Sequence, residues 1–468
     1  MPDYNPPTDL VRDAASFLRF MRSIYARQED IERTHTAVTD EFIEYVQTLG
    51  KATEAYLEDL VSTPPDPRFR ESERRQSFLS FRNFWRDLHQ FVKPSRDADT
   101  LHSPVALIEQ LEAMLSKIPE LDGSRLLICH TAEANYIQFP RSEMRVDAEH
   151  YEATVPDSPT FPDKVAFIAI PYSQESSLFT NIIICHEMGH FAFEERCVDA
   201  DLSVHIEAAL QTHFSELVSD SDSENEVSWC RQRLWNWAEE VYCDRFAIGL
   251  IGPAYSFSYI EMFDVIGTAT GNGVNHFNDT HPSDSCRFKE HADQLERCGW
   301  WPLLGTVGLS YSKVISDLRA IPEDQYAFIS DDRSELDDRV LAAFCRDVKP
   351  HIADLVTGTF QGRETIFHGQ VDIDCIAAVH RYLCEGVVPA TLVHDGQAFM
   401  PDPAILINAA YLFYLDRVPE LINRIKATRK EHLETVSERD KWGQSAERWT
   451  LKALEDLRLP SRRRLWGS

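Results

Sequence analysis

Residues 181–193 read Asn-Ile-Ile-Ile-Cys-His-Glu-Met-Gly-His-Phe-Ala-Phe, a polar pentapeptide inside an apolar run. The apolar residues on both sides predict a buried helix. Residues four apart share a helix face, so His186 and His190 can direct their imidazoles at one metal ion. Glu187 is rotated toward the side where a water would bind, which is the pattern of a zinc peptidase. Gly189 leaves room for another element or a substrate to approach. The alternative, a surface helix with two incidental histidines, fits poorly with these apolar neighbours.

A catalytic zinc ion needs a third protein ligand and leaves its fourth position to water. Residues 237–247, Trp-Ala-Glu-Glu-Val-Tyr-Cys-Asp-Arg-Phe-Ala, predict a second helix, on which Glu240 and Asp244 share a face. We expect Glu240 to bind the metal and Asp244 to accept the free ring N–H of a ligating histidine. Glu239 is the competing choice of ligand, but only Glu240 has an acidic partner one turn later. A solvated acidic face is the alternative, which the aromatic neighbours disfavour.

A third segment, residues 279–288, reads Asp-Thr-His-Pro-Ser-Asp-Ser-Cys-Arg-Phe. Ser283 is a good N-cap and predicts a helix that runs to about residue 298. His281 then lies in the turn before this helix, where its imidazole can stabilise the oxyanion that forms when a peptide carbonyl is attacked. Tyr242 or Tyr255 is expected to assist it. A histidine of a surface loop is the alternative interpretation.

Taken together, His-Glu-x-x-His, Glu-x-x-x-Asp and Thr-His-Pro-Ser with a following arginine resemble the gluzincin metallopeptidases, and most closely the HtpX-like and CAAX prenyl endopeptidase family. The resemblance covers residues 160 to 300. It implies the zinc ligands His186, His190 and Glu240, the catalytic base Glu187, the transition-state stabiliser His281, and the supporting residues Asp244 and Arg287. The membrane-embedded members of the family carry hydrophobic spans around these helices, and no such span is visible here.

Three short β-rich runs, residues 125–129, 136–139 and 164–171, precede the first metal helix. Their order fits the zincin arrangement, in which an extended peptide adds to an edge strand beside the metal. We expect residues 167–170 to lie along this cleft; an internal strand of a small sheet is the alternative. The predicted fold class is α+β and predominantly helical, with a zincin-like core of a small mixed sheet, the HExxH helix and the glutamate helix.

Helical regions are expected on both sides of this core. We predict a helical N-terminal region over 1–120, the catalytic domain over 121–303 and a helical C-terminal region over 304–468. Apolar periodicity predicts helices around 10–24, 42–49, 78–92, 373–383 and 403–426. Residues 215–228 predict an acidic, mobile loop. The apolar stretch 404–415 is shorter than the roughly 20 residues of a membrane span and predicts a buried core helix.

The composition narrows the class of protein. A net charge of −29 argues against nucleic acid as a partner. The ten cysteines form no Cys-x-x-Cys pair and the first residues contain no secretory signal, so we expect reduced thiols in a cytoplasmic protein. Cys185 and Cys243 adjoin the site residues, and we interpret both as small packing residues that face away from the ligands.

The sequence therefore predicts a soluble, zinc-dependent endopeptidase that hydrolyses peptides or proteins and has no membrane span. The alternative is a metal-stabilised regulatory or interaction protein, in which the zinc site is vestigial or gated and the helical flanks bind a protein partner. A zinc hydrolase that acts on a bond other than a peptide bond stays open as a third possibility.

Overall fold

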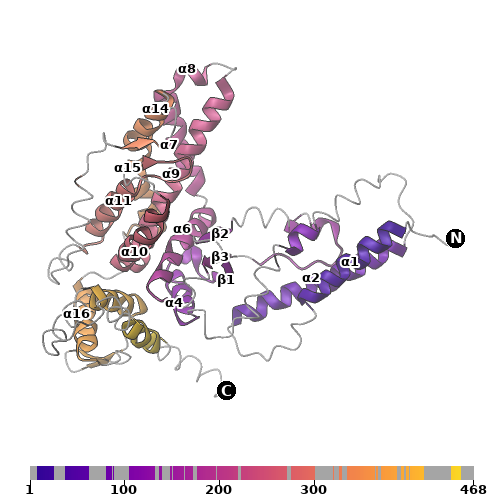
Figure 1. The fold of residues 1–468 in the computed structure, drawn as a ribbon, viewed down its shortest axis with the longest axis horizontal. Coiled ribbons are helices and arrows are strands. Elements are labelled where there is room, and N and C mark those ends of the chain that lie inside the picture. The colour runs from indigo at the N-terminus through magenta and orange to yellow at the C-terminus, as the bar shows by residue number, and fades with distance from the viewer. Residues whose placement is uncertain are drawn as a thin grey trace. The chain divides into compact units, whose positions relative to one another are not determined.

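A computed structural model gives the fold of the chain, which Figure 1 shows as a ribbon. The residues that the structure describes are 8–25, 37–62, 81–86, 88, 105–131, 136–139, 148–149, 151–162, 164–171, 177–196, 198–219, 223–270, 276–300, 320, 326–328, 335–363, 365–366, 370–386, 392–394, 397–399, 401–415 and 444–454.

The chain forms two compact units, each made of two segments. Unit 1 comprises Met1–Ser103 and Gly123–Tyr172, and unit 2 comprises Pro104–Asp122 and Ser173–Ser468. The short β-rich runs belong to unit 1 and the predicted metal helices to unit 2. The predicted 121–303 domain is therefore divided between the two units.

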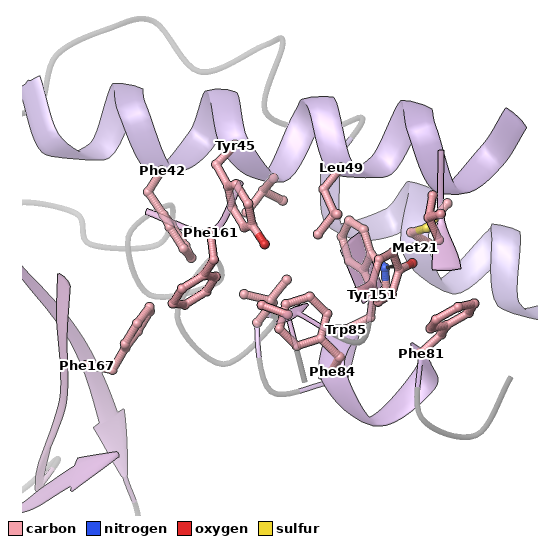
Figure 2. Close-up of a cluster of buried hydrophobic side chains, with 14 of the residues drawn as sticks. Met21, Phe42, Tyr45, Leu49, Phe81, Phe84, Trp85, Tyr151, Phe161 and Phe167 are labelled. Atoms are coloured by element: carbon pink, nitrogen blue, oxygen red, sulfur yellow. Dashed lines mark hydrogen bonds between the residues drawn. The ribbon is translucent and has the colours of Figure 1, made fainter. Parts of the chain in front are cut away.

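Unit 1 contains α1 (Thr8–Tyr25), α2 (Ala37–Ser62), a helical segment at 81–86 and a small sheet. The predicted apolar faces of these helices are buried: Met21, Phe42, Leu49 and Trp85 are 0–3% exposed and belong to one hydrophobic cluster, which Figure 2 shows. The polar atoms inside the cluster are paired. The Tyr151 hydroxyl accepts a hydrogen bond from Trp85 Nε1 at 2.7 Å and lies 2.6 Å from Thr53 Oγ1.

The sheet of unit 1 has the strand order β1-β3-β2, with β1 Arg125–Thr131, β2 Ile137–Phe139 and β3 Val165–Pro171. β3 pairs in parallel with β1 and antiparallel with β2, which confirms the predicted small mixed sheet. β3 is the central strand and is buried along its whole length. The expectation that residues 167–170 form a substrate-binding edge is therefore wrong, because residues 167–169 pair with β1 on one side and with β2 on the other.

Unit 2 is built around the long helix α9 (Glu224–Ile251), which is roughly 42 Å long at 1.5 Å per residue. α6, α7, α10, α11, α14 and α15 pack against it (Figure 1). Besides α9, the labelled elements of unit 2 are α4 (Val105–Leu115), η2 (Pro119–Leu121), η4 (Thr180–Ile183), α6 (Ile184–Glu195), α7 (Val198–His213), α8 (Ser215–Val218), α10 (Pro253–Thr270), β4 (His276–Phe277), α11 (Asp284–Arg297), β5 (Ala327–Phe328), α14 (Glu335–Ala343), the π-helical turn η7 (Phe344–Val348), α15 (Lys349–Thr359), α16 (Gln370–Cys384), β6 (Leu392–His394) and β7 (Gln397–Phe399). Residues 403–415 and 444–454 are helical as well.

A sharp turn separates α9 from α10 and depends on two residues. Gly252 adopts a φ of 82°, which favours glycine, and its N–H bonds to Ile248 O. Asn408, in the apolar stretch 404–415, accepts a hydrogen bond from Ala254 N at 2.9 Å and donates one to Ile251 O at 2.5 Å. Residues 403–415 form the predicted buried helix, whose single amide holds the α9–α10 turn; 416–426 lie outside the described residues.

Two further predictions from the sequence are tested by the described residues. None of the described helices combines the length and hydrophobicity of a membrane span. The predicted acidic loop 215–228 is wrong in part: residues 215–218 form α8, and 224–228 are the first turns of α9, whose acidic side chains suit a helix N-terminus.

Candidate metal centre

α6 carries the His-Glu-x-x-His pentapeptide and lies directly against α9. Nine of its residues are buried, as the flanking isoleucines and phenylalanines predict. A Cβ added at Gly189 would lie 2.7 Å from Cys243 Cα and 2.9 Å from Cys243 Cβ. Glycine at this position therefore lets the two helix backbones approach closely. In this arrangement both histidines of α6 point toward the carboxylates of α9.

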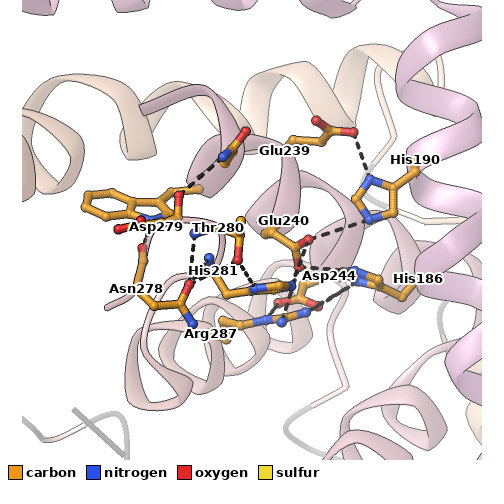
Figure 3. Close-up of polar contacts among 12 residues, drawn as sticks. His186, His190, Glu239, Glu240, Asp244, Asn278, Asp279, Thr280, His281 and Arg287 are labelled. Carbon is orange, nitrogen blue, oxygen red and sulfur yellow. Dashed lines mark hydrogen bonds and ion pairs between the residues drawn. The ribbon is translucent and has the colours of Figure 1, made fainter. Parts of the chain in front are cut away.

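Both imidazoles present Nε2 to the same carboxylate. His186 Nε2 lies 3.3 Å from Glu240 Oε2, and His190 Nε2 lies 3.7 Å from Glu240 Oε1 (Figure 3). The structure thus brings together the three residues that the sequence analysis selected as ligands, from two segments about fifty residues apart. The solvated-face alternative for Glu240 is wrong, since its side chain is only 12% exposed.

The other nitrogen of each imidazole is held by a second carboxylate of α9. His186 Nδ1 lies 3.0 Å from Asp244 Oδ1, and His190 Nδ1 lies 2.8 Å from Glu239 Oε1. Such contacts fix the ring orientation and the tautomer, and they direct each Nε2 at Glu240. Asp244 thus has the predicted position. Glu239, considered only as a rival ligand, holds the second histidine in the same way.

Asp244 is completely buried and is surrounded by donors. Arg287 of α11 donates to it through Nε at 2.6 Å and Nη2 at 2.7 Å, and the Tyr255 hydroxyl donates to Oδ1. Arg287 Nη1 also lies 3.2 Å from Glu240 Oε2, so a single guanidinium contacts both carboxylates. His291, one turn after Arg287 on α11, lies 3.4 Å from Asp244 Oδ2. Arg287 therefore supports the site, as the resemblance implied.

His281 lies at the open side of the site. Its Nε2 is 3.5 Å from Glu240 Oε1, and the side chain is 42% exposed. Ser283 caps α11 by accepting a hydrogen bond from Cys286 N, as predicted, and α11 ends at Arg297. His281 is a residue of a surface loop, as the alternative interpretation had it, and this loop also places its ring beside Glu240.

The loop that carries His281 is fastened to α9 and to itself. Asn278 Oδ1 accepts hydrogen bonds from His281 N at 2.6 Å and from Thr280 N at 2.9 Å. Trp237 Nε1 donates to Asn278 O at 2.8 Å, and Arg233 pairs with Asp279. Trp237 and Arg233 lie one and two turns before Glu240 on the same helix face, so α9 positions both the ligand and the loop.

The charges of the site are strongly coupled. Burial opposes a charge on His186, but the attraction of Glu240 and the contacts to Asp244 raise its pKa to about 10. Burial also disfavours charged carboxylates at Glu240 and Asp244. The positive groups of His281, Arg287 and His186 nevertheless hold the pKa of Glu240 well below its usual range, and Arg287 does the same for Asp244. Both acids are therefore ionised.

The residues present fit a divalent metal ion. Glu240 Oε2 is buried, and its charged neighbours among the described residues are Arg287 Nη1 at 3.2 Å and His186 Nε2 at 3.3 Å. Two imidazoles with supported Nδ1 atoms and one carboxylate are the donor set of a catalytic zinc site. His186, His190 and Glu240 would hold this ion.

Cys243 is a further candidate ligand. Its Sγ and one nitrogen each of His186 and His190 lie within 4.8 Å of one another. The expectation that Cys243 faces away from the imidazoles is wrong, because residues three apart on a helix share a face and Glu240 is three residues before it. Cys185, in contrast, is buried in α6 outside this group, in keeping with a packing role.

Two aromatic residues do not have the predicted place. The Tyr242 hydroxyl is 2.7 Å from Thr359 Oγ1 of α15, and the Tyr255 hydroxyl is bonded to Asp244 and lies 3.2 Å from His186 Nδ1. Neither hydroxyl lies on the Nε2 side, so neither assists His281. His291 was missed altogether, although its spacing from Arg287 on a predicted helix could have indicated it.

Comparisons with known proteins add no relative to this picture. No family model, curated protein or solved structure matches the chain. The likeness to gluzincins and the zincin arrangement of the core therefore stay predictions that rest on the motif residues and on the geometry of the site.

Proposed function

We propose that this protein is a zinc-dependent hydrolase that cleaves peptide bonds. One observation carries the proposal: two imidazole Nε2 atoms face one buried carboxylate at 3.3 and 3.7 Å, while each Nδ1 is held by a different carboxylate. A histidine pair that served only stability would not need this division of its nitrogens.

A zinc ion held here by His186, His190 and Glu240 would lower the pKa of its bound water and would polarise a carbonyl group. The protein supplies proton transfer through Glu187, which follows the first histidine on α6 and is 6% exposed. Its charge reaches the site: burial lowers the pKa of His190, but Glu239, Glu240 and, to a smaller degree, Glu187 raise it above the ordinary value. In the proposed reaction Glu187 accepts a proton from the attacking water and passes it to the leaving amine.

His281 is the residue best placed to stabilise the developing oxyanion. Its ring is the most exposed of the three imidazoles that lie beside Glu240 Oε1 and Oε2, and no carboxylate holds its other nitrogen in the described contacts. A hydrogen bond from His281 Nε2 to the former carbonyl oxygen would strengthen as negative charge develops there.

The test is the substitution Glu187→Gln. We expect the variant to retain stoichiometric zinc, because Glu187 is not a ligand, and to lose cleavage of a quenched fluorescent peptide library. Glu224→Gln, which changes an exposed glutamate at the start of α9, is the matched control and should keep full activity. Retained turnover in Glu187→Gln would reject Glu187 as the base, and a wild-type protein that binds no zinc would reject the whole proposal.

A second candidate function is a metal-stabilised regulatory or interaction protein. The place of Cys243 beside both histidines favours it, because four protein ligands close a tetrahedral site and such sites are structural. Cleavage of the peptide library by the zinc-loaded protein, abolished by a chelator, would decide for the hydrolase. Under both functions we propose a cytoplasmic protein with reduced thiols.

A further inference from the structure

The thiol of Cys243 lies where the two metal helices touch most closely. The position of Gly189, between the two histidines, places α6 within contact distance of the Cys243 backbone. The thiol is completely buried. It projects from α9 on the side of Glu240, and its Sγ is within 4.8 Å of both imidazoles.

We propose that Cys243 is a fourth metal ligand, which alternates with water at the ion held by His186, His190 and Glu240. This inference rests on the proposed metal site and adds a ligand to it. Each helix then contributes two ligands, at i and i+4 on α6 and at i and i+3 on α9. For metal–nitrogen and metal–sulfur bonds of about 2.0–2.3 Å, tetrahedral ligand atoms are roughly 3.5 Å apart. The grouping within 4.8 Å reaches this separation by small side-chain rotations.

A sulfur ligand has two consequences for the site. A thiolate prefers zinc over magnesium, calcium or manganese, so Cys243 would set the metal selectivity of a site that otherwise contains nitrogen and oxygen donors. With Cys243 bound, the four protein ligands fill the coordination sphere and leave no position for water. Peptide cleavage then requires Cys243 to leave the ion, so the thiol controls the fraction of reactive protein.

Cobalt(II) in place of zinc tests this directly, since a thiolate ligand gives cobalt an intense near-ultraviolet charge-transfer absorption that nitrogen and oxygen ligands lack. We expect the band in the cobalt-loaded wild type and its loss in Cys243→Ser, with the d–d absorption of bound cobalt retained. Cys230→Ser is the matched control: Cys230 is another buried thiol of α9, about 20 Å along the helix from Cys243, and its substitution should leave the band unchanged.

Each outcome decides between the proposals. A wild type that binds cobalt stoichiometrically without the band overturns Cys243 as a ligand and leaves the His–His–Glu site intact. A band that persists in Cys243→Ser also overturns it. A wild type that binds no cobalt and no zinc overturns both proposals. Cys243→Ala, checked by circular dichroism, replaces the serine variant if the latter does not fold.

Discussion

Gly189→Ala is the substitution that tests most directly how the metal centre is assembled. The added methyl carbon would lie 2.7 Å from Cys243 Cα, 2.9 Å from Cys243 Cβ and 3.2 Å from Cys243 O. Carbon atoms in contact prefer about 3.5–4.0 Å, so the shortfall is about 1 Å. Two of the three atoms belong to the backbone of α9 and cannot rotate away. We therefore expect α6 and α9 to separate by about this distance.

The cost for stability is small, and the cost for metal binding is large. Overpacking destabilises by about 1–3 kcal/mol, and alanine regains about 1 kcal/mol of helix propensity, which leaves a net loss of about 0–2 kcal/mol. Metal–ligand distances, however, tolerate changes of only about 0.2 Å. A separation of about 1 Å moves Glu240 on α9 away from both histidines on α6. We expect zinc affinity to fall by about 10–100-fold or more, which matches the effect of disturbing the support of metal ligands.

Zinc affinity is measured by competition with a chromophoric chelator, and stability by urea denaturation of the metal-free protein. Gly358→Ala is the matched control, since Gly358 is also a helical glycine but its added Cβ would meet only the end of Arg196, at 3.9 Å. This control should bind zinc normally and be at least as stable as the wild type. Unchanged zinc affinity in Gly189→Ala would refute the reasoning that close helix contact assembles the site.

Three further predictions concern the groups around the ligands. Arg287→Met removes the bidentate partner of the completely buried Asp244 and should lower the free energy of unfolding, measured by urea denaturation, by about 3–5 kcal/mol. The control Arg231→Met breaks an exposed ion pair and should lower it by at most about 1 kcal/mol. Equal losses in the two variants would contradict this prediction. His281→Gln should lower kcat about 100-fold or more with little change in zinc content, and unchanged kcat would exclude His281 from transition-state stabilisation. Metal-free protein should lose stability as pH rises: the folded pKa of His186, about 10, exceeds the ordinary 6.5, so its stabilisation is complete below 6.5 and disappears toward pH 10. Thermal unfolding with a chelator present measures this, and a flat profile between pH 6.5 and 10 would argue against it.

Local patterns in the sequence were sufficient to predict the helices and to select most of the candidate site residues. Periodic apolar residues predict α6 and α9, and the serine cap predicts the start of α11, because a helix is specified by neighbours within a few residues. A spacing of four residues also predicts that His186 and His190 share one helix face, and that Glu240 and Asp244 share another. These inferences need no knowledge of what lies opposite each helix, and the described structure agrees with them.

Only the tertiary structure decided which atoms meet. Four features depend on the distance and rotation between α6, α9 and α11, which no local pattern encodes. They are the different partners of the two nitrogens of each histidine, the support of His190 by Glu239, the approach of Cys243 to the imidazoles and the burial of His291. The same holds for β3, whose central place follows from its pairing with strands on both sides. The local sequence determines which side chains share one face of a helix or strand, and tertiary packing determines which other element contacts that face.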